Sequence, residues 1–328
     1  MFKRLAFALL PALLLFGVAE IVLRVLGWPE VTTAFEHNEP FWVVDPDLHS
    51  YEMPHNEENT SFQVSTNSDG LRTSIEVTDP KKSLRIMTLG CSTTFGWGVS
   101  DVETYPSRLQ TLLTEAGYST VEVVNGGQPG YTSFQGSWLW DSVLEDYKPD
   151  IVLIGYIVQD ARKAAYSDKS QAILQGDNRF LKDNLLYRSK GYLALRYGMG
   201  KVQVQAKERS SQDDGGVYRV PPEDYVVNLR SLTQKIKNTG AKPVLFGYPL
   251  ERTGYTEQHR LILKVAAQEL QVGYLDPQAK MEQAATDARL YFPRDKGHAN
   301  AAGNDQIAQW VFEHLQSHQY LSTPKSQP

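Results

Sequence analysis

Apolar and polar positions follow two periods along most of the chain, and together they predict strands and helices in turn. Short apolar runs indicate buried strands, and amphipathic stretches indicate helices. The predicted strands cover residues 84–89, 121–124, 151–156, 243–248 and 272–275. The predicted helices cover residues 104–116, 133–147, 222–238, 257–270, 278–285 and 300–317. This alternation predicts an α/β fold, a three-layer α/β/α sandwich around a five-stranded parallel sheet.

The alternation is interrupted once, between residues 161 and 220. Part of this stretch has a helical pattern (184–197), and part is polar (207–216). We interpret it as an insertion near the carboxyl edge of the sheet. The predicted body then covers residues 81–320, and a disordered tail follows over residues 321–328.

An apolar segment opens the chain. Lys3 and Arg4 precede an apolar run over residues 5–19, and the apolar pattern continues as far as Trp28. Positive charges ahead of such a run keep the amino terminus in the cytoplasm and send the body across the membrane. We therefore expect residues 1–28 to be a signal anchor or a signal peptide.

Two membrane-related interpretations of this segment stay open, and a third is that it forms a buried helix of the body. The small residues up to Ala19 permit a cleaved signal peptide. Alternatively, residues 5–26 form one transmembrane helix, in which Glu20 and Arg24 pair or reach the interface. We favour the anchor, because the apolar pattern does not stop at Ala19.

Residues 29–80 are rich in Pro, Asn, Asp and Glu, and we interpret them as a linker. Residues 61–64 and 73–77 have strand character. Residues 67–70 (NSDG) between them are typical of a turn. The linker is therefore predicted to carry a β-hairpin.

Composition narrows the classes of function. The chain has 328 residues, 41% of them hydrophobic, and a net charge of -5, which suits a globular body and argues against nucleic acid as a partner. Its one cysteine, Cys91, has no partner for an internal disulfide, and no Cys/His cluster has zinc-site spacing. We predict no metal and no cofactor.

Polar residues gather where three predicted strands end. They are Gly90, Cys91 and Ser92 after the first strand, residues 125–130 (NGGQPG) after the second, and Gln159 with Asp160 after the third. The carboxyl ends of parallel strands lie at one edge of a sheet, where such folds bind ligands. We therefore expect a site at this edge.

Asp295 and His298 precede the last helix in a predicted loop. This spacing allows the carboxylate to orient the imidazole, which can then deprotonate a serine. A metal site is the alternative, although only two ligands are visible. Residues 126–130 do not have the G-x-G-x-x-G spacing of a nucleotide loop, and Pro129 lacks the N–H that such a loop offers.

Over residues 84–315 the sequence resembles the SGNH (GDSL-type) serine hydrolases, which build an esterase site from four short blocks on a flavodoxin-like sandwich. Residues 67–72 and 97–99 further resemble a membrane-anchored bacterial subgroup of that family. The matching residues are Gly90, Ser92, Thr94 and Gly96; Asn125 and Gly130; Gln159 and Asp160; and Asp295, His298, Asn300 and Gly303.

The resemblance implies a catalytic role for three residues. Ser92 is the nucleophile, His298 the general base and then the acid, and Asp295 fixes the histidine tautomer.

The resemblance also implies an oxyanion hole made by the backbone N–H groups of Ser92 and Gly130 and by the side chain of residue 159. Gly90, Asn125 and Asp160 support the site.

Two residues depart from the family pattern. The residue before the serine is usually Asp and is Cys91 here, so Cys91 is an alternative nucleophile or a small buried residue that supports the turn. The oxyanion asparagine is replaced by Gln159, which keeps the amide but adds a methylene. Loss of one such donor costs ~10²–10³ in rate.

We therefore expect an extracytoplasmic serine esterase, anchored in the membrane and facing the periplasm or cell exterior, that acts on an acylated small molecule, lipid or carbohydrate. An O-acyltransferase on envelope or secreted polysaccharide uses the same triad, and a catalytically impaired binding protein is the alternative from another class. Tyr131, Trp97 and Tyr156 line a pocket or belong to the core. The histidines other than His298 are predicted to lie on the surface or in the linker.

Overall fold

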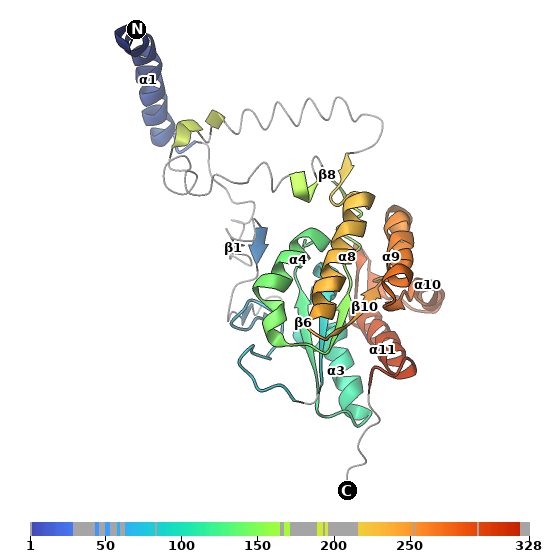
Figure 1. Ribbon diagram of the computed structural model, residues 1–328. Helices are drawn as coiled ribbons and strands as arrows, with labels where there is room; N and C mark the ends of the chain where they lie inside the picture. Colours follow the sequence, from blue (N-terminus) through green and yellow to red (C-terminus); the bar gives the residue numbers. More distant parts are fainter. Residues whose placement is uncertain are drawn as a thin grey trace. The chain divides into compact units, whose positions relative to one another are not determined.

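The chain divides into two compact units in a computed structural model (Figure 1). The structure describes residues 2–28, 43–45, 50–52, 58–59, 63–82, 84–164, 167–170, 189–192, 194–195, 216–251, 253–293 and 295–321. The smaller unit comprises Met1–Pro40, Ala164–Tyr166 and Ser170–Val217. The larger unit comprises Phe41–Lys163, Ser167–Lys169 and Tyr218–Pro328.

Five parallel strands form the central sheet of the larger unit, in the order β11-β10-β7-β5-β6. In chain order this is 2-1-3-4-5, the flavodoxin-like arrangement, whose ligand crevice lies where the strand order reverses. Here that point lies between β5 and β7. The bounds are β5 (Leu84–Gly90), β6 (Val121–Gly127), β7 (Ile151–Ile154), β10 (Lys242–Phe246) and β11 (Gly273–Leu275). The predicted α/β fold with a five-stranded parallel sheet is confirmed.

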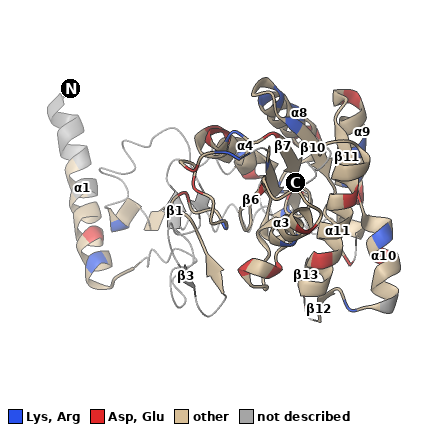
Figure 2. Ribbon diagram, turned by 90° about the horizontal axis from the view of Figure 1, so that it is seen from below, with Lys and Arg blue, Asp and Glu red and all other residues tan. Residues whose placement is uncertain are grey.

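Helices cover both faces of this sheet. Right-handed crossovers place α3 on one face and α4, α8 and α9 on the other, and α3 packs against α11 while α8 packs against α4 and α9 (Figure 1). Figure 2 shows Lys, Arg, Asp and Glu mainly on the helices and loops around the sheet. The bounds are α3 (Tyr105–Glu115), α4 (Ser133–Ser142), α8 (Pro222–Asn238), α9 (Glu257–Leu270), α10 (Gln278–Asp287) and α11 (Ala301–Ser317).

The burial of the strands explains their apolar sequences. Ile86, Met87 and Leu89 of β5 have no exposed surface, and neither do Val152 and Leu153 of β7. A strand covered on both faces needs apolar residues at successive positions rather than at alternate ones. The sheet is therefore the centre of the hydrophobic core.

The predicted helix over residues 133–147 is too long. α4 ends at Ser142, and a 3₁₀ helix, η2 (Leu144–Tyr147), follows after Val143 leaves the helical conformation with φ -139°. The break lets Leu144 and Tyr147 enter the core, where both are fully buried. Tertiary packing thus overrides the local helical pattern.

The predicted hairpin between residues 61–64 and 73–77 is wrong, because residues 73–77 form no strand. β4 (Val64–Ser65) instead pairs with β3 (Glu58–Asn59). The turn itself is present, with the Gly70 N–H donating to the Asn67 carbonyl at 3.1 Å. The Asn67 amide also donates to the Tyr147 hydroxyl at 2.7 Å, so the turn packs this segment onto the body.

Short elements complete the larger unit and its border with the smaller one. β1 (Val43–Asp45) pairs antiparallel with β2 (Ser50–Glu52). The 3₁₀ helices η1 (Asp101–Glu103) and η4 (Gly254–Thr256) precede α3 and α9. The two-residue strands β8 (Lys163–Ala164) and β9 (Val217–Tyr218) lie where the chain passes from one unit to the other.

The smaller unit contains α1 (Phe2–Val25). Glu20 of this helix accepts hydrogen bonds from the Ser189 hydroxyl at 2.8 Å and from the backbone N–H groups of Lys190 and Gly191 at 3.0 and 2.7 Å. Residues 190–192 and 194–195 are helical and residue 189 is not, whereas residues 184–188, 193 and 196–197 of the predicted helix, the stretch 207–215 and residues 322–328 lie outside the described residues. Across the ranges given above, no helix combines the length and the apolarity that crossing a membrane requires.

We predict that Gly127→Ala destabilises the fold by about 3 kcal/mol. A Cβ atom at residue 127 would lie 2.4 Å from the Phe95 nitrogen and 2.8 Å from the Thr94 carbonyl carbon, both backbone atoms. Gly254→Ala is the matched control, because a Cβ there meets no atom within 4 Å. Urea denaturation measures both changes, and equal free energies of unfolding for the two variants would contradict the prediction.

Candidate active site

Ser92 lies directly beyond the carboxyl end of β5, as the first residue of the short helix α2 (Ser92–Phe95). The backbone N–H groups of Thr94 and Phe95 both donate to the Cys91 carbonyl at 3.0 Å, which closes this helical turn. Ser92 is only 6% exposed. The strand end and the turn together fix the serine at the edge of the sheet where the chain order reverses.

Asp295 and His298 lie on a strand, and not in the loop predicted from the sequence. β13 (Asp295–Ala299) pairs antiparallel with β12 (Tyr291–Phe292). Asn300 follows as the N-cap of α11, with its side chain accepting from the Gly303 N–H at 3.0 Å. A hydrogen-bonded strand before a capped helix gives the imidazole a rigid base.

The structure brings Ser92, His298 and Asp295 together. His298 Nε2 lies 2.8 Å from Ser92 Oγ, and His298 Nδ1 lies 2.5 Å from Asp295 Oδ2. An ionised carboxylate only accepts hydrogen bonds, so Nδ1 carries the proton and Nε2 presents its lone pair to the serine hydroxyl. This is the geometry in which a histidine can remove a serine proton.

Asp295 is held in its ionised form. Partial burial raises its pKa, but the hydrogen bond and charge of His298, together with the backbone N–H groups of Gly297 and His298, outweigh this effect and leave the pKa below its ordinary value. The carboxylate therefore stays charged at neutral pH, where it can orient the imidazole.

The sequence predicts two backbone donors for the oxyanion hole, the N–H groups of Ser92 and Gly130. Gly130 has φ +78°, in the left-handed region that glycine adopts without strain. Over the described part of the chain, no acceptor is found for the N–H of Ser92 or of Gly130. Neither N–H group is therefore used by another described part of the chain.

Gln159 follows β7 and is 8% exposed. Its Oε1 atom accepts from Arg219 Nη1 at 3.0 Å, and the same nitrogen donates to the Gly130 carbonyl at 2.8 Å. One guanidinium thus contacts both loops that were predicted to supply oxyanion donors.

The predicted supporting residues hold the backbone around the site. A Cβ at Gly90 would lie 2.1 Å from Thr94 Oγ1, so a larger residue cannot stand there without moving α2. Asn125 donates to the Phe95 carbonyl at 3.3 Å and accepts from the Gly127 N–H at 3.0 Å. These contacts hold α2 against the ends of β5 and β6.

Asp160 is fully buried beside the first turn of α4. Its Oδ1 accepts from the Ser133 N–H at 2.9 Å, while Oδ2 finds no hydrogen-bond partner among the atoms that the structure places. Burial raises its pKa to about 6, against 3.8 ordinarily, although the bonds from Ser133 act in the opposite direction. Asp160 therefore supports α4 from within the core.

For several other residues the structure decides between the alternatives that the sequence left open. Cys91 is 1% exposed, belongs to the core, and lies with its sulfur 3.3 Å from Thr93 Oγ1, which fits a small buried residue. Tyr131 and Tyr156 are buried in that core as well. Trp97 is partly buried and packs against Val64 and Phe95.

His259 and His314 are buried, so the prediction that they lie on the surface or in the linker is wrong. Burial lowers the pKa of both imidazoles, that of His314 to about 4. His259 uses its Nε2 atom to contact the Val220 carbonyl at 2.9 Å. His37, His49 and His55 lie outside the described residues.

Sequence reasoning missed the arginines that brace the site. Arg72 donates to the carbonyls of Phe95, Gly96 and Val99 at 3.1, 2.7 and 2.7 Å, and so holds the loop after α2. Its place in the sequence motif at residues 67–72 was the only signal. Arg219 pairs with Asp168 across 51 positions, and no local pattern marks a pair so far apart.

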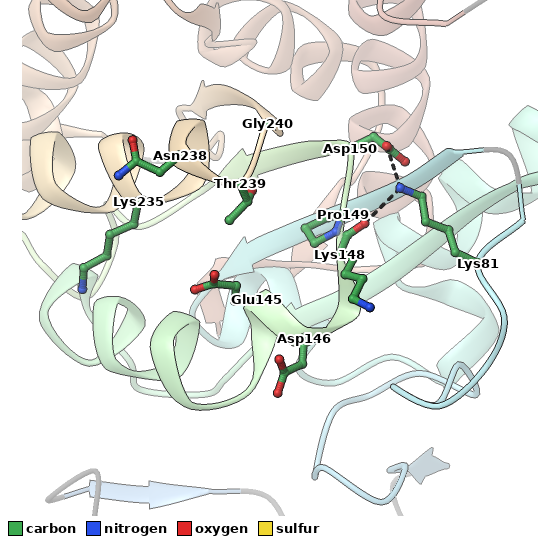
Figure 3. A pocket seen from close by; sticks show the side chains of 10 residues that line it. All are labelled: Lys81, Glu145, Asp146, Lys148, Pro149, Asp150, Lys235, Asn238, Thr239 and Gly240. Carbon is green, nitrogen blue, oxygen red and sulfur yellow. Dashed lines mark hydrogen bonds and ion pairs between the residues drawn. The ribbon is translucent and has the colours of Figure 1, made fainter.

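A polar hollow of about 580 Å³ lies at the opposite edge of the sheet (Figure 3). At one side of it Lys81 pairs with Asp150, just before β7, at 2.6 Å. Residues of both charges line it, and none of the predicted site residues does. The hollow is therefore separate from the Ser92 site.

A family model described as the GDSL-like lipase/acylhydrolase family matches residues 88–306, about two thirds of the chain. Among solved structures, a mutant of Axe2, an acetyl-xylooligosaccharide esterase from Geobacillus stearothermophilus, is 16% identical. The alignment covers 75% of this chain and 98% of that one, with a TM-score of 0.50. LAE5, an alpha/beta hydrolase from the metagenome of Lake Arreo, Spain, is 15% identical over 75% of this chain and 99% of that one, also with a TM-score of 0.50. The comparison with curated proteins found no match.

We predict that Asp160→Asn changes the pH dependence of stability. Because the pKa of Asp160 is about 6 when folded, between pH 4 and pH 6 the folded chain keeps a proton that the unfolded chain has released. The free energy of unfolding of the wild type therefore falls as the pH rises through this window. A pKa difference of about 2 corresponds to about 3 kcal/mol.

The free energy of unfolding of Asp160→Asn, relative to that of the wild type, should therefore rise by about 3 kcal/mol between pH 4 and pH 7. Urea denaturation of both proteins at each pH provides the measurement. The same stability difference at both pH values would contradict the assignment.

Proposed function

The chain belongs to the GDSL-like lipase/acylhydrolase family and is an ester-hydrolysing enzyme, and we propose that it acts through an acyl-Ser92 intermediate. The observation that carries this proposal is the hydrogen-bonded series Ser92–His298–Asp295 at the carboxyl edge of the sheet. A serine hydroxyl bonded to an imidazole that is in turn bonded to a carboxylate is the arrangement that nucleophilic acyl transfer requires.

In the first half of the proposed reaction, His298 Nε2 takes the Ser92 hydroxyl proton while Ser92 Oγ bonds to the ester carbonyl carbon. The negative charge that develops on the carbonyl oxygen is stabilised by the N–H groups of Ser92 and Gly130 and by the Gln159 amide. The tetrahedral intermediate collapses, the C–O bond to the alcohol breaks, and His298 gives its proton to the leaving oxygen.

In the second half, water replaces the alcohol. His298 removes a proton from the water as it attacks the acyl carbon, and the proton then returns to Ser92 Oγ when the acyl–serine bond breaks. Asp295 remains charged throughout and stabilises the imidazolium. The products are a carboxylic acid and the free enzyme.

The substrate is proposed as an O-acylated small molecule, lipid or carbohydrate. The acetyl-xylooligosaccharide esterase named above is a fold relative only, so its substrate is one candidate among these. An O-acyltransferase on envelope or secreted polysaccharide would use the same residues with a sugar hydroxyl in place of water. Hydrolysis of p-nitrophenyl acetate without any added acceptor separates the two, because a strict transferase needs the hydroxyl.

Gln159 favours a second candidate from another class, a catalytically impaired protein that binds its ligand without turnover. A glutamine is longer than asparagine by one methylene, and an amide in the wrong place does not stabilise the oxyanion. Faster turnover by Gln159→Asn would support a weakened site.

From the sequence of residues 1–28 we further propose that the enzyme lies on the extracytoplasmic side, held by this segment as an uncleaved anchor. The support is the apolar run after Lys3 and Arg4 in the sequence and the bonds of Glu20 to residues 189–191 within the same unit; among the described helices, α1, which contains Pro11, does not have the length and apolarity of a membrane span. The polar end of the helix is then anchored to the insertion. In this orientation the body, residues 81–320, faces the periplasm or the cell exterior.

We predict that Ser92→Ala and His298→Ala each lower kcat for p-nitrophenyl acetate by at least ~10⁴-fold, because either change removes the nucleophile or its base. A fluorophosphonate probe should label the wild type and leave Ser92→Ala unlabelled. Ser142→Ala is the control, because this exposed hydroxyl donates to the Trp138 carbonyl of its own helix and to no other residue that the structure describes. A folded wild-type protein that the probe fails to label would refute the acyl-serine mechanism.

We predict that the full chain stays with the membrane pellet after an alkaline carbonate wash, and that a variant without residues 1–28 is recovered in the supernatant. The mass of the mature chain distinguishes an anchor from a signal peptide cleaved near Ala19. Recovery of the intact full chain in the carbonate supernatant would rule out the anchor.

A further inference from the structure

Arg219 occupies a position that the reaction above does not explain. It lies just after residues 170–217 of the smaller unit, and its ion-pair partner Asp168 lies just before them. Arg219 Nε and Nη2 donate to the two Asp168 oxygens at 3.0 and 2.8 Å. This bidentate pair fixes the plane of the guanidinium.

Asp168 in turn is tied to the start of α4. Its Oδ2 atom accepts from the Thr132 hydroxyl at 2.8 Å and from the Gln135 amide at 3.0 Å. Thr132 and Gln135 also form the capping box of α4. The carboxylate is 5% exposed and the arginine side chain 21%, so the pair is largely shielded from water and keeps a defined geometry.

The third guanidinium nitrogen of Arg219, Nη1, donates to the Gly130 carbonyl and to Gln159 Oε1. These two residues lie in the two loops that are predicted to supply oxyanion donors. A guanidinium has only donors, so the Gln159 amide must present its oxygen to Arg219 and turn its nitrogen away. In the part of the chain that the structure describes, no acceptor is found for that nitrogen. An asparagine at residue 159 would be shorter by one C–C bond, about 1.5 Å, which would separate its oxygen from Arg219.

We propose that Arg219 is a positioning residue of the oxyanion hole, which sets the orientation of the Gln159 amide and holds the Gly130 loop beside it. The inference rests on the proposed function, because an oxyanion forms only if Ser92 attacks an ester. It assigns a reason for the longer side chain at residue 159: the glutamine reaches a fixed cation at the base of the insertion.

A double-mutant cycle on p-nitrophenyl acetate hydrolysis tests the coupling. Arg219→Met should lower kcat by ~10–10²-fold, within the ~10²–10³-fold that loss of an oxyanion donor costs, and leave KM within about twofold. Gln159→Ala should lower kcat at least as much, and adding Arg219→Met to it should cost little more, since the arginine acts through that amide. Arg219→Lys should recover only part of the loss, because an ammonium cannot form the same fork.

Arg219 also lines a pocket of about 210 Å³ with Phe134 and Val227, so a change in KM alone would assign it to substrate binding and overturn the proposal. Losses that multiply in the double variant, or an unchanged kcat in Arg219→Met, would overturn it as well. Arg230→Met is the matched control, because that arginine pairs with Glu269 on the surface of α8 and α9.

Loss of Arg219 leaves the buried Asp168 carboxylate without its cation, which can unfold the protein. The double variant Arg219→Met with Asp168→Asn removes both charges, so it tests the proposal without leaving a buried carboxylate unpaired. In this background kcat should still be lowered to the level of Arg219→Met, and full activity would overturn the proposal.

A readout that needs no turnover separates this inference from the proposed function. In the Ser92→Ala protein, the ¹⁵N side-chain amide signal of Gln159 should shift on Arg219→Met and stay in place on Arg230→Met. Absence of Ser92-dependent hydrolysis in the wild type would refute the esterase alone. An unmoved Gln159 signal would refute the role of Arg219.

Discussion

The close approach of α2 to the ends of two strands is the constraint on which the site depends. Side chains at Gly90 and Gly127 would collide with Thr94 and with the backbone of Phe95, so only bare backbone lets this four-residue helix settle at the edge of the sheet. Asn125 then fastens α2 through the Phe95 carbonyl. Ser92 begins that helix, and its position is therefore fixed by packing rather than by a flexible loop.

The partners of Ser92 come from the other end of the chain, and packing brings them to it. Phe292 of β12 lies under Gly98, where a Cβ would be 2.9 Å from the ring, and the Asn304 side chain of α11 accepts from the Tyr105 N–H of α3 at 3.0 Å. These contacts join the hairpin that carries His298 to the loop and helix that follow Ser92. The 2.8 Å contact between the serine and the imidazole is thus supported on both sides.

Periodicity and motifs were sufficient to predict the sheet and the residues that meet at its edge, because both depend on local pattern and on chain order. They failed where contacts between residues far apart in the sequence determine the local structure. Residues 73–77 have strand character, yet the chain uses Asn67 to pack against Tyr147; α4 stops at Ser142 so that Leu144 reaches the core. His259 is buried against a carbonyl of the segment before α8, and no sequence signal gives that contact.

The pairing of Arg219 with Asp168 is also a contact between residues far apart in the sequence, and it affects the chemistry of the site. Each residue alone is an ordinary charge at one border of the insertion, and only the fold shows that they close its base while contacting Gly130 and Gln159. A shielded ion pair resists separation, because either charge left alone would lack a partner in a poorly hydrated place. The two ends of the insertion therefore cannot move apart without disturbing Gly130 and Gln159, which couples the insertion to the proposed oxyanion hole.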